Sequence, residues 1–507
     1  MKKNMSLVAC SCFMPSSESE VRKWNQIIKK QMQMGDAKGA MLTYVNMQML
    51  VGLCADNYTY PILLKAAGTC SCPRIGFALH AQTIKTGFVR HAFVQNALLN
   101  MYSTFHRIND ASKVFDMVPV KDVVSWNSML NAYTSNGRTE DALNLFNLMP
   151  LKDITSLNIM ISGYSSSGMV VAARRILDEM PVKDVVSWNS MILGYTRAGE
   201  LEMAAQLFRS MPVRNVVTWN SMITGCLQSQ LFREVLRLFD EMKRENCVPD
   251  HLTVAGVLSA CAHLGSLERG KQAHIYAIDN GFASSPHVTA ALVDMYAKCG
   301  SIQYSLQVFY KASIKDIYCW NAVISALGLH GHGSAALKLF NHMRKNHIIA
   351  DDITFICLLN ACSHSGLVQE GCQLFSCMQK EFGISPKIEH YGCMVDLLAR
   401  AEHIDCAYRL VDAMPFEPGE AILGALLSAC VIHRDLETGE RVMKMVFSMA
   451  PNLSDGEIMM FVNLYASCGR LEEANRWRKM MNATGMVKAA GCCIIEVNGV
   501  FHKFLAA

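Results

Sequence analysis

The stretch VVSWNSML, which begins at Val123, decides the fold because the chain repeats it almost unchanged. VVSWNSMI begins at Val185 and VVTWNSMI begins at Val216, so the three starts span intervals of 62 and 31 residues. The same Trp-Asn pair recurs outside these phrases, at residues 24–25 and 320–321. A fixed period of about 30–35 residues is the signature of a protein built from stacked repeats.

The repeated unit predicts two helices joined by a turn. Its first apolar stripe has the i, i+3, i+4, i+7 spacing of one helix face and consists of Trp126, Met129, Leu130 and Tyr133. A second stripe consists of Ala142, Leu145, Phe146 and Met149. Gly137 is a natural helix stop between them, and Pro150 ends the second helix. Neither helix can bury its stripe alone, so the units must stack, and we predict an all-α solenoid.

This template begins twelve times before about Gly419. The predicted starts are Val21, Asn57, Ala92, Val123, Ile154, Val185, Val216, His251, Pro286, Ile317, Asp352 and Ile388. The unit lengths alternate: several units have 31 residues and end in phrases such as MPVKD, which closes at Asp184, whereas others have about 35.

Several phrases carry a family resemblance. They are LSACAHLG at Leu258–Gly265, MYAKCGS at Met295–Ser301 and YGCMVDLLAR at Tyr391–Arg400. Together with the alternating unit lengths, they resemble a plant pentatricopeptide-repeat protein of the class that mixes ordinary (P), long (L) and short (S) repeats. The resemblance extends from residue 21 to the C-terminus. It implies a right-handed superhelical solenoid of helix-turn-helix repeats, with about twelve repeats over residues 21–419.

The C-terminal part resembles the tail of organellar RNA-editing factors. ILGALLSAC at Ile422–Cys430 and FVNLYASCGRLEEANRWRKMM at Phe461–Met481 resemble their degenerate E1 and E2 repeats, which places these over residues 420–486. Residues 487–507 resemble a truncated start of the E+ segment that follows, with Cys493 and Ile494 where serine and tryptophan are common.

The resemblance raises the question of a deaminase domain, because many relatives continue into one. Such a domain needs zinc ligands and a glutamate in an H-x-E…P-C-x-x-C arrangement. The sequence contains neither motif, so we expect a protein that is not an enzyme, holds no metal or other cofactor, and acts with a deaminase in trans.

Composition sets further bounds. The net charge of +4 permits nucleic acid as a partner without indicating it. The 51% of hydrophobic residues suit helices that are buried on both sides, and the 20 cysteines contain no C-x-x-C pair, so we interpret them as reduced, mostly packed thiols. The charge-free stretch Gly39–Ala55 contains Thr43 and falls where a second repeat helix belongs, so we expect no membrane association.

The N-terminal residues 1–20 are interpreted as a short organellar targeting segment. They contain Lys2, Lys3 and several serines, and the first acid is Glu18. The family resemblance implies the mitochondrion, with the chloroplast as the alternative.

Two polar positions recur in the units. The fifth residue is Asn25, Asn96, Asn127, Asn158, Asn189, Asn220 and Asn321, and the last residue of the same units is Asp56, Asp122, Asp153, Asp184, Asn215, Asp250 and Asp351. Each asparagine falls outside the core stripe of its helix. A purely structural alternative is that both positions cap helix N-termini. Their joint recurrence instead predicts a row of polar pairs along one edge of the stack.

The family resemblance assigns these pairs to base reading in single-stranded RNA, one base per repeat. A carboxamide offers a donor and an acceptor, whereas a carboxylate only accepts. In the family, Asn with Asp favours uracil, Asn with Asn accepts either pyrimidine, and the second residue of a unit, such as Val124, packs against base faces. Applied unit by unit, this rule predicts the ligand 5′-U-n-U-U-U-Y-U-n-n-U-n-n.

The resemblance therefore implies a site-recognition factor for C-to-U editing of organellar transcripts. Its expected partners are a pyrimidine-rich single-stranded organellar RNA, a deaminase-bearing pentatricopeptide-repeat protein in trans and small organellar editing cofactors. One alternative is a factor for splicing, stability or translation of organellar RNA. A second alternative is a helical scaffold that binds proteins and no RNA.

Overall fold

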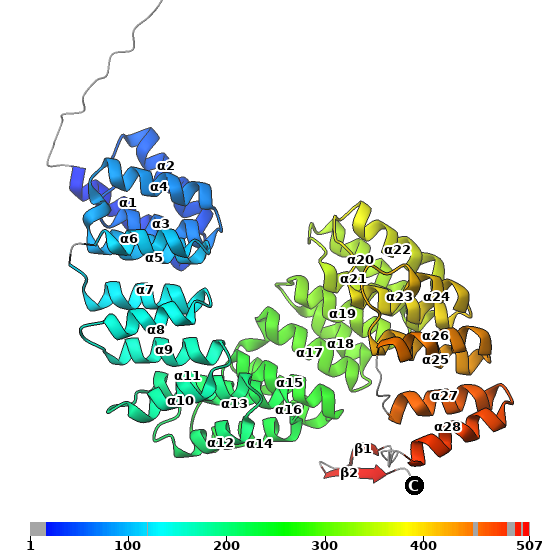
Figure 1. The fold of residues 1–507 in the computed structure, drawn as a ribbon. Coiled ribbons are helices and arrows are strands. Elements are labelled where there is room, and N and C mark those ends of the chain that lie inside the picture. Colours follow the sequence, from blue (N-terminus) through cyan, green and yellow to red (C-terminus); the bar gives the residue numbers. More distant parts are fainter. Residues whose placement is uncertain (1–16, 119, 450–454, 484–491, 498–499, 506–507) are drawn as a thin grey trace, which may run out of the picture. The chain divides into compact units, whose positions relative to one another are not determined.

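The computed structural model of the chain describes residues 17–118, 120–449, 455–483, 492–497 and 500–505. Most of the predicted targeting segment lies outside these residues. The described part contains 28 α-helices, two short 3₁₀ helices and two strands (Figure 1). The helices of the first six pairs are α1 Ser17–Gln33, α2 Ala37–Val51, α3 Thr59–Thr69, α4 Pro73–Lys85, α5 Ala92–Thr104, α6 Ile108–Asp116, α7 Val123–Ser135, α8 Thr139–Leu148, α9 Ile154–Ser166, α10 Val170–Glu179, α11 Val185–Arg197 and α12 Leu201–Ser210.

The later elements continue the same alternation. They are α13 Val216–Gln228, α14 Phe232–Arg244, α15 His251–Leu264, α16 Leu267–Asp279, α17 Pro286–Lys298, α18 Ile302–Lys311, α19 Ile317–Leu329, α20 Gly333–Lys345, α21 Asp352–Ser365, α22 Val368–Lys380, α23 Ile388–Arg400, α24 Ile404–Asp412, α25 Glu420–His433, α26 Leu436–Met449, α27 Asp455–Ser467, α28 Leu471–Ala483, β1 Cys492–Val497 and β2 Val500–Leu505. The 3₁₀ helices are η1 Phe88–Arg90 and η2 Phe282–Ser284.

The chain divides into two compact units, one ending at Gly225 and the other beginning at Cys226. In the first unit, α3, α5, α7, α9 and α11 pack in succession, and each also packs against the even-numbered helix that follows it. In the second unit, α15, α17, α19, α21, α23, α25 and α27 do the same. The predicted all-α class and helix-turn-helix repeat are confirmed.

The repeat period of the sequence matches the helix starts. Ten odd-numbered helices, from α5 at Ala92 to α23 at Ile388, begin at the first residue of a predicted unit. Two helices depart from the predicted starts: α1 begins at Ser17, before the predicted Val21, and α3 begins at Thr59, two residues after the predicted Asn57. The Asp56 carboxylate accepts from the Thr59 N–H at 2.7 Å.

The repeated tryptophans hold neighbouring repeats together. Trp126 of α7 packs edge-to-face on Phe115 of α6, with ring centroids 5.2 Å apart. Trp320 of α19 packs in the same way on Phe309 of α18 at 5.0 Å. Edge-to-face aromatic pairs stabilise a contact beyond the area they bury, by about 0.5–1.5 kcal/mol. Trp219 of α13 makes the same kind of contact with Phe208 of α12 at 4.8 Å, so three of the Trp-Asn phrases mark the same packing contact between repeats.

The basic residue in the loop phrase also has a structural role. Lys121 donates to the Val118 carbonyl oxygen at 3.1 Å and lies over the Phe115 ring at 5.1 Å. Arg214 donates to the Phe208 carbonyl oxygen at 3.0 Å and lies over that ring at 4.6 Å. Cations near the last carbonyls of a helix stabilise its C-terminus. These side chains are therefore engaged by the protein itself.

Two strands add to the predicted all-helical fold. β1 and β2 pair antiparallel, with Val497 opposite Val500 and Cys492 opposite Leu505. They fall in the segment assigned from sequence to the E+-like tail. A signal was present in the sequence, because Asn498-Gly499 is the dipeptide that two-residue hairpin connections favour. None of the described helices is both long and apolar enough to cross a membrane.

Candidate nucleic-acid interface

The acids at the last position of the units cap the helices that follow. The Oδ1 atoms of Asp122, Asp153 and Asp184 accept from the backbone N–H groups of Ser125, Ser156 and Ser187, each at 2.8 Å. Asp250 and Asp351 accept in the same way from Thr253 and Thr354, at 2.9 and 2.8 Å. The capping alternative considered for these residues is correct, and it fixes the direction of each carboxylate.

The asparagines at the fifth position are not caps. They lie inside the first helix of each unit, and most meet the cap residue of the next. The Nδ2–H groups of Asn127, Asn158 and Asn321 donate to Oδ1 of Asp153, Asp184 and Asp351, each at 3.1 Å. Asn25 donates to Asp56 at 3.1 Å, and Asn189 donates to Asn215 Oδ1 at 3.3 Å. Five of the seven predicted pairs are therefore joined by a side-chain hydrogen bond.

Asn96 and Asp122 are the exception within the first unit. No hydrogen bond joins the side chains of Asn96 and Asp122, although both lie in the described part of the chain, and nothing in the structure explains the difference. Asn220 lies on α13 in the first unit, and Asp250 lies at the start of α15 in the second.

The amide oxygens of these asparagines face inward. Oδ1 of Asn96, Asn127, Asn158 and Asn189 is buried without a hydrogen-bond partner. In the Asn321 pair, Thr354 Oγ1 donates to the amide oxygen at 2.8 Å. In Asn127, Asn158, Asn189 and Asn321 the amino group is the part of the amide that meets the cap residue, so these asparagines act as hydrogen-bond donors at this edge.

The cap acids are charged at neutral pH. Burial alone would raise the pKa of Asp153, but hydrogen bonds from Ser156 and the Asn127 amide outweigh it and hold the pKa below the ordinary 3.8. The balance of burial and hydrogen bonds lowers the pKa of Asp184 in the same way. For Asp153, the described residues give hydrogen bonds to Oδ1 and none to Oδ2. The Asn127–Asp153 pair thus offers an amide N–H next to a free carboxylate oxygen, a donor beside an acceptor, whereas Asn25 donates to both oxygens of Asp56.

Exposed apolar side chains accompany the pairs. The second residues of the units are apolar and exposed to solvent. Their exposed fractions are 63% for Tyr58, 67% for Phe93, 58% for Val124, 56% for Val186, 57% for Val217 and 56% for Tyr318. The sequence argument named only the valines. Tyr58, Phe93 and Tyr318 stand in the same register, and counting one residue past each predicted start would have found them.

The cysteines in the described part of the chain are free thiols. Within the described residues, no group of three or more His, Cys, Asp or Glu side chains is arranged to hold a metal ion. Burial raises the pKa of Cys362 to about 12 and that of Cys226 to about 11, which keeps both thiols neutral at physiological pH.

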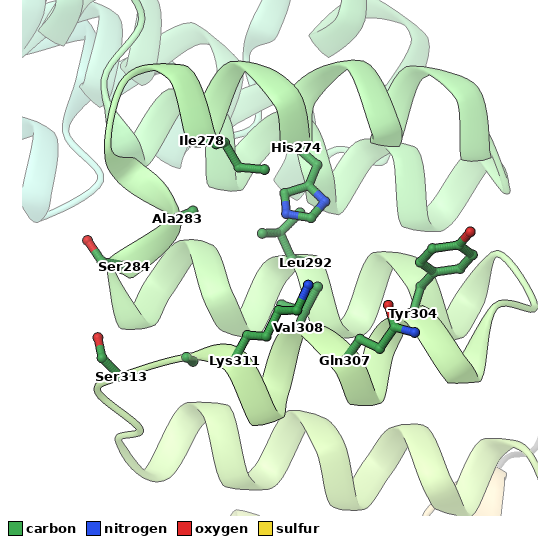
Figure 2. A pocket seen from close by; sticks show the side chains of 11 residues that line it. His274, Ile278, Ala283, Ser284, Leu292, Tyr304, Gln307, Val308, Lys311 and Ser313 are labelled. Carbon is green, nitrogen blue, oxygen red and sulfur yellow. The ribbon is translucent and has the colours of Figure 1, made fainter.

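A cavity of about 340 Å³ in the second unit lies apart from the predicted site residues, none of which lines it (Figure 2). Its walls come from α16, η2, α17 and α18, with His274 and Lys311 as the basic groups. His274 Nδ1 is 2.9 Å from the Tyr296 hydroxyl, and burial together with the Lys311 charge lowers the pKa of this imidazole.

These features define an α-helical repeat protein with a row of polar pairs, and comparisons with known proteins agree. A model of the PPR repeat family matches residues 121–156, 214–263 and 315–364, and a model of the PPR repeat matches residues 155–185, 186–216 and 353–381. The pentatricopeptide repeat-containing protein At1g50270 of Arabidopsis thaliana is 34% identical over 499 residues, which is 98% of this chain and 68% of the relative. The chain belongs to the pentatricopeptide-repeat family.

Other relatives are considerably longer than this chain. The chloroplastic pentatricopeptide repeat-containing protein CRR2 of Arabidopsis thaliana is 33% identical over 487 residues, 95% of this chain and 60% of CRR2. The chloroplastic protein DOT4 of the same plant is 43% identical over 258 residues, 51% of this chain and 30% of DOT4. The chain therefore spans less than two thirds of the length of these two relatives.

Solved structures share the fold. The pentatricopeptide repeat protein PPR10 from maize superposes with a TM-score of 0.52 at 19% identity, covering 94% of this chain and 76% of PPR10. PPR10 in complex with an 18-nucleotide psaJ RNA element gives a TM-score of 0.50 at 18% identity, over 93% of this chain and 75% of that chain.

Proposed function

We propose that this protein binds single-stranded organellar RNA in a sequence-dependent way and selects sites for C-to-U editing. The observation that carries the proposal is the repeated pair of an asparagine amino group and a capped carboxylate, joined at 3.1 Å in four repeats. A scaffold that binds only proteins has no use for such a row. PPR10, which shares the fold, forms a complex with an RNA element, and this supports the proposed RNA binding.

The chemistry of the pair favours uracil. Uracil presents an N–H between two carbonyl oxygens, so the free Oδ2 of Asp153 can accept from the base while the second N–H of Asn127 donates to a carbonyl oxygen. Cytosine presents an unprotonated ring nitrogen at the same place, which a carboxylate repels. Asn215 replaces the acid in one repeat, so that unit accepts either pyrimidine.

The editing role and its partners follow from the C-terminal resemblance. Helix starts at Val185, Val216, His251 and Pro286 give repeats of 31 and 35 residues in one chain, which supports the class with mixed repeat lengths. In this proposal the repeats choose the site, and residues 420–507 recruit a deaminase-bearing pentatricopeptide-repeat protein in trans, with small organellar editing cofactors. The chain itself performs no catalysis. The mitochondrion is the proposed compartment, and the chloroplast, named for CRR2 and DOT4, is the alternative.

The test is sequencing of mitochondrial and chloroplast cDNA from plants that lack the protein. We expect loss of C-to-U conversion at one or a few cytidines that are preceded by the predicted U-rich sequence. Unchanged editing with an altered splicing or transcript-end pattern would reject the editing role and favour the processing alternative. The compartment follows from which transcripts change.

A further inference from the structure

One of the Asn–Asp pairs of the second compact unit contains a third side chain, a buried threonine of the helix that follows. Thr354 Oγ1 donates to Asn321 Oδ1 at 2.8 Å, while Asn321 Nδ2–H donates to Asp351 Oδ1 at 3.1 Å. Thr354 is 0% exposed, so water does not compete for its hydroxyl. Both ends of the Asn321 amide are therefore held by the protein, the oxygen by a hydroxyl and the amino group by a carboxylate.

The same triad recurs in the first repeat of the chain. Thr59 Oγ1 donates to Asn25 Oδ1 at 2.8 Å, and Asn25 Nδ2–H donates to Asp56 Oδ1 at 3.1 Å. Thr59 is also 0% exposed. In both triads the hydroxyl lies 2.7 Å from Oδ1 of the cap acid as well, so its hydrogen has two acceptors within reach. The triad thus occurs once in each compact unit, at the third residue of the next repeat.

Repeats with serine at this third position lack the contact to the amide oxygen. Ser156 Oγ donates instead to the backbone oxygen of Asp153 at 2.7 Å. The amide oxygen of Asn127, which pairs with Asp153, is buried without a hydrogen-bond partner, and the same holds for Asn158. The asparagines therefore fall into two classes, one with an anchored amide oxygen and one without.

The residue at the cap also matters, as the repeat of Asn189 shows. Thr218 follows that repeat at the same third position, but its cap residue is Asn215. Thr218 Oγ1 donates to Asn215 Oδ1 at 2.9 Å, and the Asn189 amide oxygen is left without a partner. The two triads combine a threonine with an aspartate cap.

We propose that Thr59 and Thr354 are positioning residues for base reading, which make nucleotides 1 and 10 of the predicted ligand more strictly uracil-specific than nucleotides 4 and 5. Turning the amide of Asn25 or Asn321 over would break the threonine hydrogen bond in addition to the bond with the cap acid. For Asn127 the turn breaks only the latter. The inference rests on the proposed RNA binding and ranks the uracils that the repeats read.

The consequence of an anchored amide is a stronger rejection of cytosine. Uracil has a carbonyl oxygen where cytosine has an amino group, so a fixed amide N–H suits uracil and meets a second donor in cytosine. An amide that can turn over presents its oxygen to the cytosine amino group. Anchoring the oxygen removes this alternative, and because the threonine hydroxyl is buried, no water takes its place when it is deleted.

The test uses the full chain and twelve-nucleotide RNAs of the predicted sequence, with adenine at every unassigned position. Cytosine replaces uracil either at nucleotide 10, which the Asn321 pair reads, or at nucleotide 4, which the Asn127 pair reads. We expect the loss of affinity on this replacement to be about 5-fold larger at nucleotide 10, the factor that one neutral hydrogen bond contributes. Fluorescence anisotropy measures both losses.

Three variants assign the difference to the hydroxyl. Thr354→Val keeps the shape of the side chain without its donor and should reduce the loss at nucleotide 10 to that at nucleotide 4. Thr354→Ser keeps the hydroxyl and should retain most of the discrimination. Ser156→Ala is the matched control, because it deletes the hydroxyl at the same position of a repeat whose amide oxygen has no partner, and it should leave the loss at nucleotide 4 unchanged.

A purely structural role of the threonine gives a different result. Thr354 Oγ1 also accepts from the Asp351 N–H at 3.2 Å, so Thr354→Val weakens a helix cap as well. A structural effect alone would weaken binding of the uracil and cytosine RNAs by the same factor, and that result would overturn the inference. Thr59→Val, tested at nucleotide 1, repeats the measurement in the other compact unit and serves where Thr354→Val does not fold.

The outcomes also separate this inference from the proposed function. If cytosine weakens binding equally at nucleotides 4 and 10 and Thr354→Val changes neither loss, the positioning role is overturned while base reading stands. If Thr354→Ser loses as much discrimination as Thr354→Val, the hydroxyl is not the cause and the inference is likewise overturned. If neither cytosine replacement affects binding to the unchanged protein, the proposed function fails with it.

Discussion

At the scale of the residue, one aspartate does two things. Asp153 Oδ1 caps α9 through the Ser156 N–H and also accepts from Asn127, while Oδ2 stays free. A group that must hold one orientation for folding is well suited to recognition, because no rotamer freedom remains to be lost on binding. The capping role of this position is therefore compatible with the proposed base reading.

Asn127→Ala should weaken binding to the predicted RNA by about 1–3 kcal/mol and abolish the preference for uracil at the fourth nucleotide only. Protein stability should change little, because the substitution loses one exposed hydrogen bond to Asp153 but also removes a buried amide oxygen that has no partner. Fluorescence anisotropy with single-nucleotide RNA variants measures the preference. Asn144→Ala, an exposed asparagine on α8, is the control.

Substitution of Asp153 separates its two roles. Asp153→Asn keeps a good N-cap, so stability should hold while the preference for uracil at the fourth nucleotide relaxes to either pyrimidine, as proposed for Asn189 with Asn215. Asp153→Ala should lose both the preference and about 1 kcal/mol of stability. Denaturant unfolding and RNA titration of the two variants check this; equal preferences in Asp153→Asn and the unchanged protein would contradict base reading by the carboxylate.

At the scale of the element, each repeat depends on its turn between helices. Gly137 adopts a φ of 72°, a conformation in which a side chain is strained. The backbone conformation at this predicted helix stop therefore requires glycine, which is there for more than its weak tendency to form helices. The Trp126–Phe115 contact joins α6 to α7, and Lys121 binds the Val118 carbonyl oxygen in the loop between them.

Gly137→Ala should destabilise the protein by about 1–2 kcal/mol, because alanine pays the cost of the left-handed conformation. Gly392→Ala is the matched control with the opposite sign. Gly392 lies inside α23, and an added Cβ there would make an ordinary contact of 3.6 Å with Ile422. Alanine at that position should leave stability unchanged or raise it by about 0.5–1 kcal/mol. Chemical unfolding of the two variants in parallel is the measurement.

At the scale of the whole molecule, stability follows the ionisation of buried groups. Burial lowers the pKa of His80 and His274 below the ordinary 6.5. Hydrogen bonds to the cap carboxylates outweigh their burial and lower the pKa values below 3.8 for Asp56, Asp122, Asp153 and Asp184. In each case the unfolded chain binds protons more readily than the folded one, so stability rises with pH.

We therefore expect stability to be fully present above about pH 6.5 and to fall in two steps on acidification. The first step begins below 6.5, as the histidines take up protons, and the second lies below 3.8, where the capped acids do. Denaturant midpoints measured from pH 8 to pH 3 test this. His80→Gln/His274→Gln should flatten the first step and leave the second. A first step that persists in this variant would contradict the assignment.

The sequence by itself determined the period, the helix pairs and the places where helices begin, because these follow from local signals that recur: apolar spacing, glycine stops and aspartate caps. It also located the polar pairs, since residues in equivalent positions of stacked repeats fall along one edge. It did not reveal the hairpin of β1 and β2, whose one signal was a single Asn-Gly dipeptide.

Only the tertiary structure decided how each pair is arranged. The contact of Asn127 with Asp153 crosses from one repeat to the next, and its geometry depends on how closely α7 and α9 pack, which no single repeat encodes.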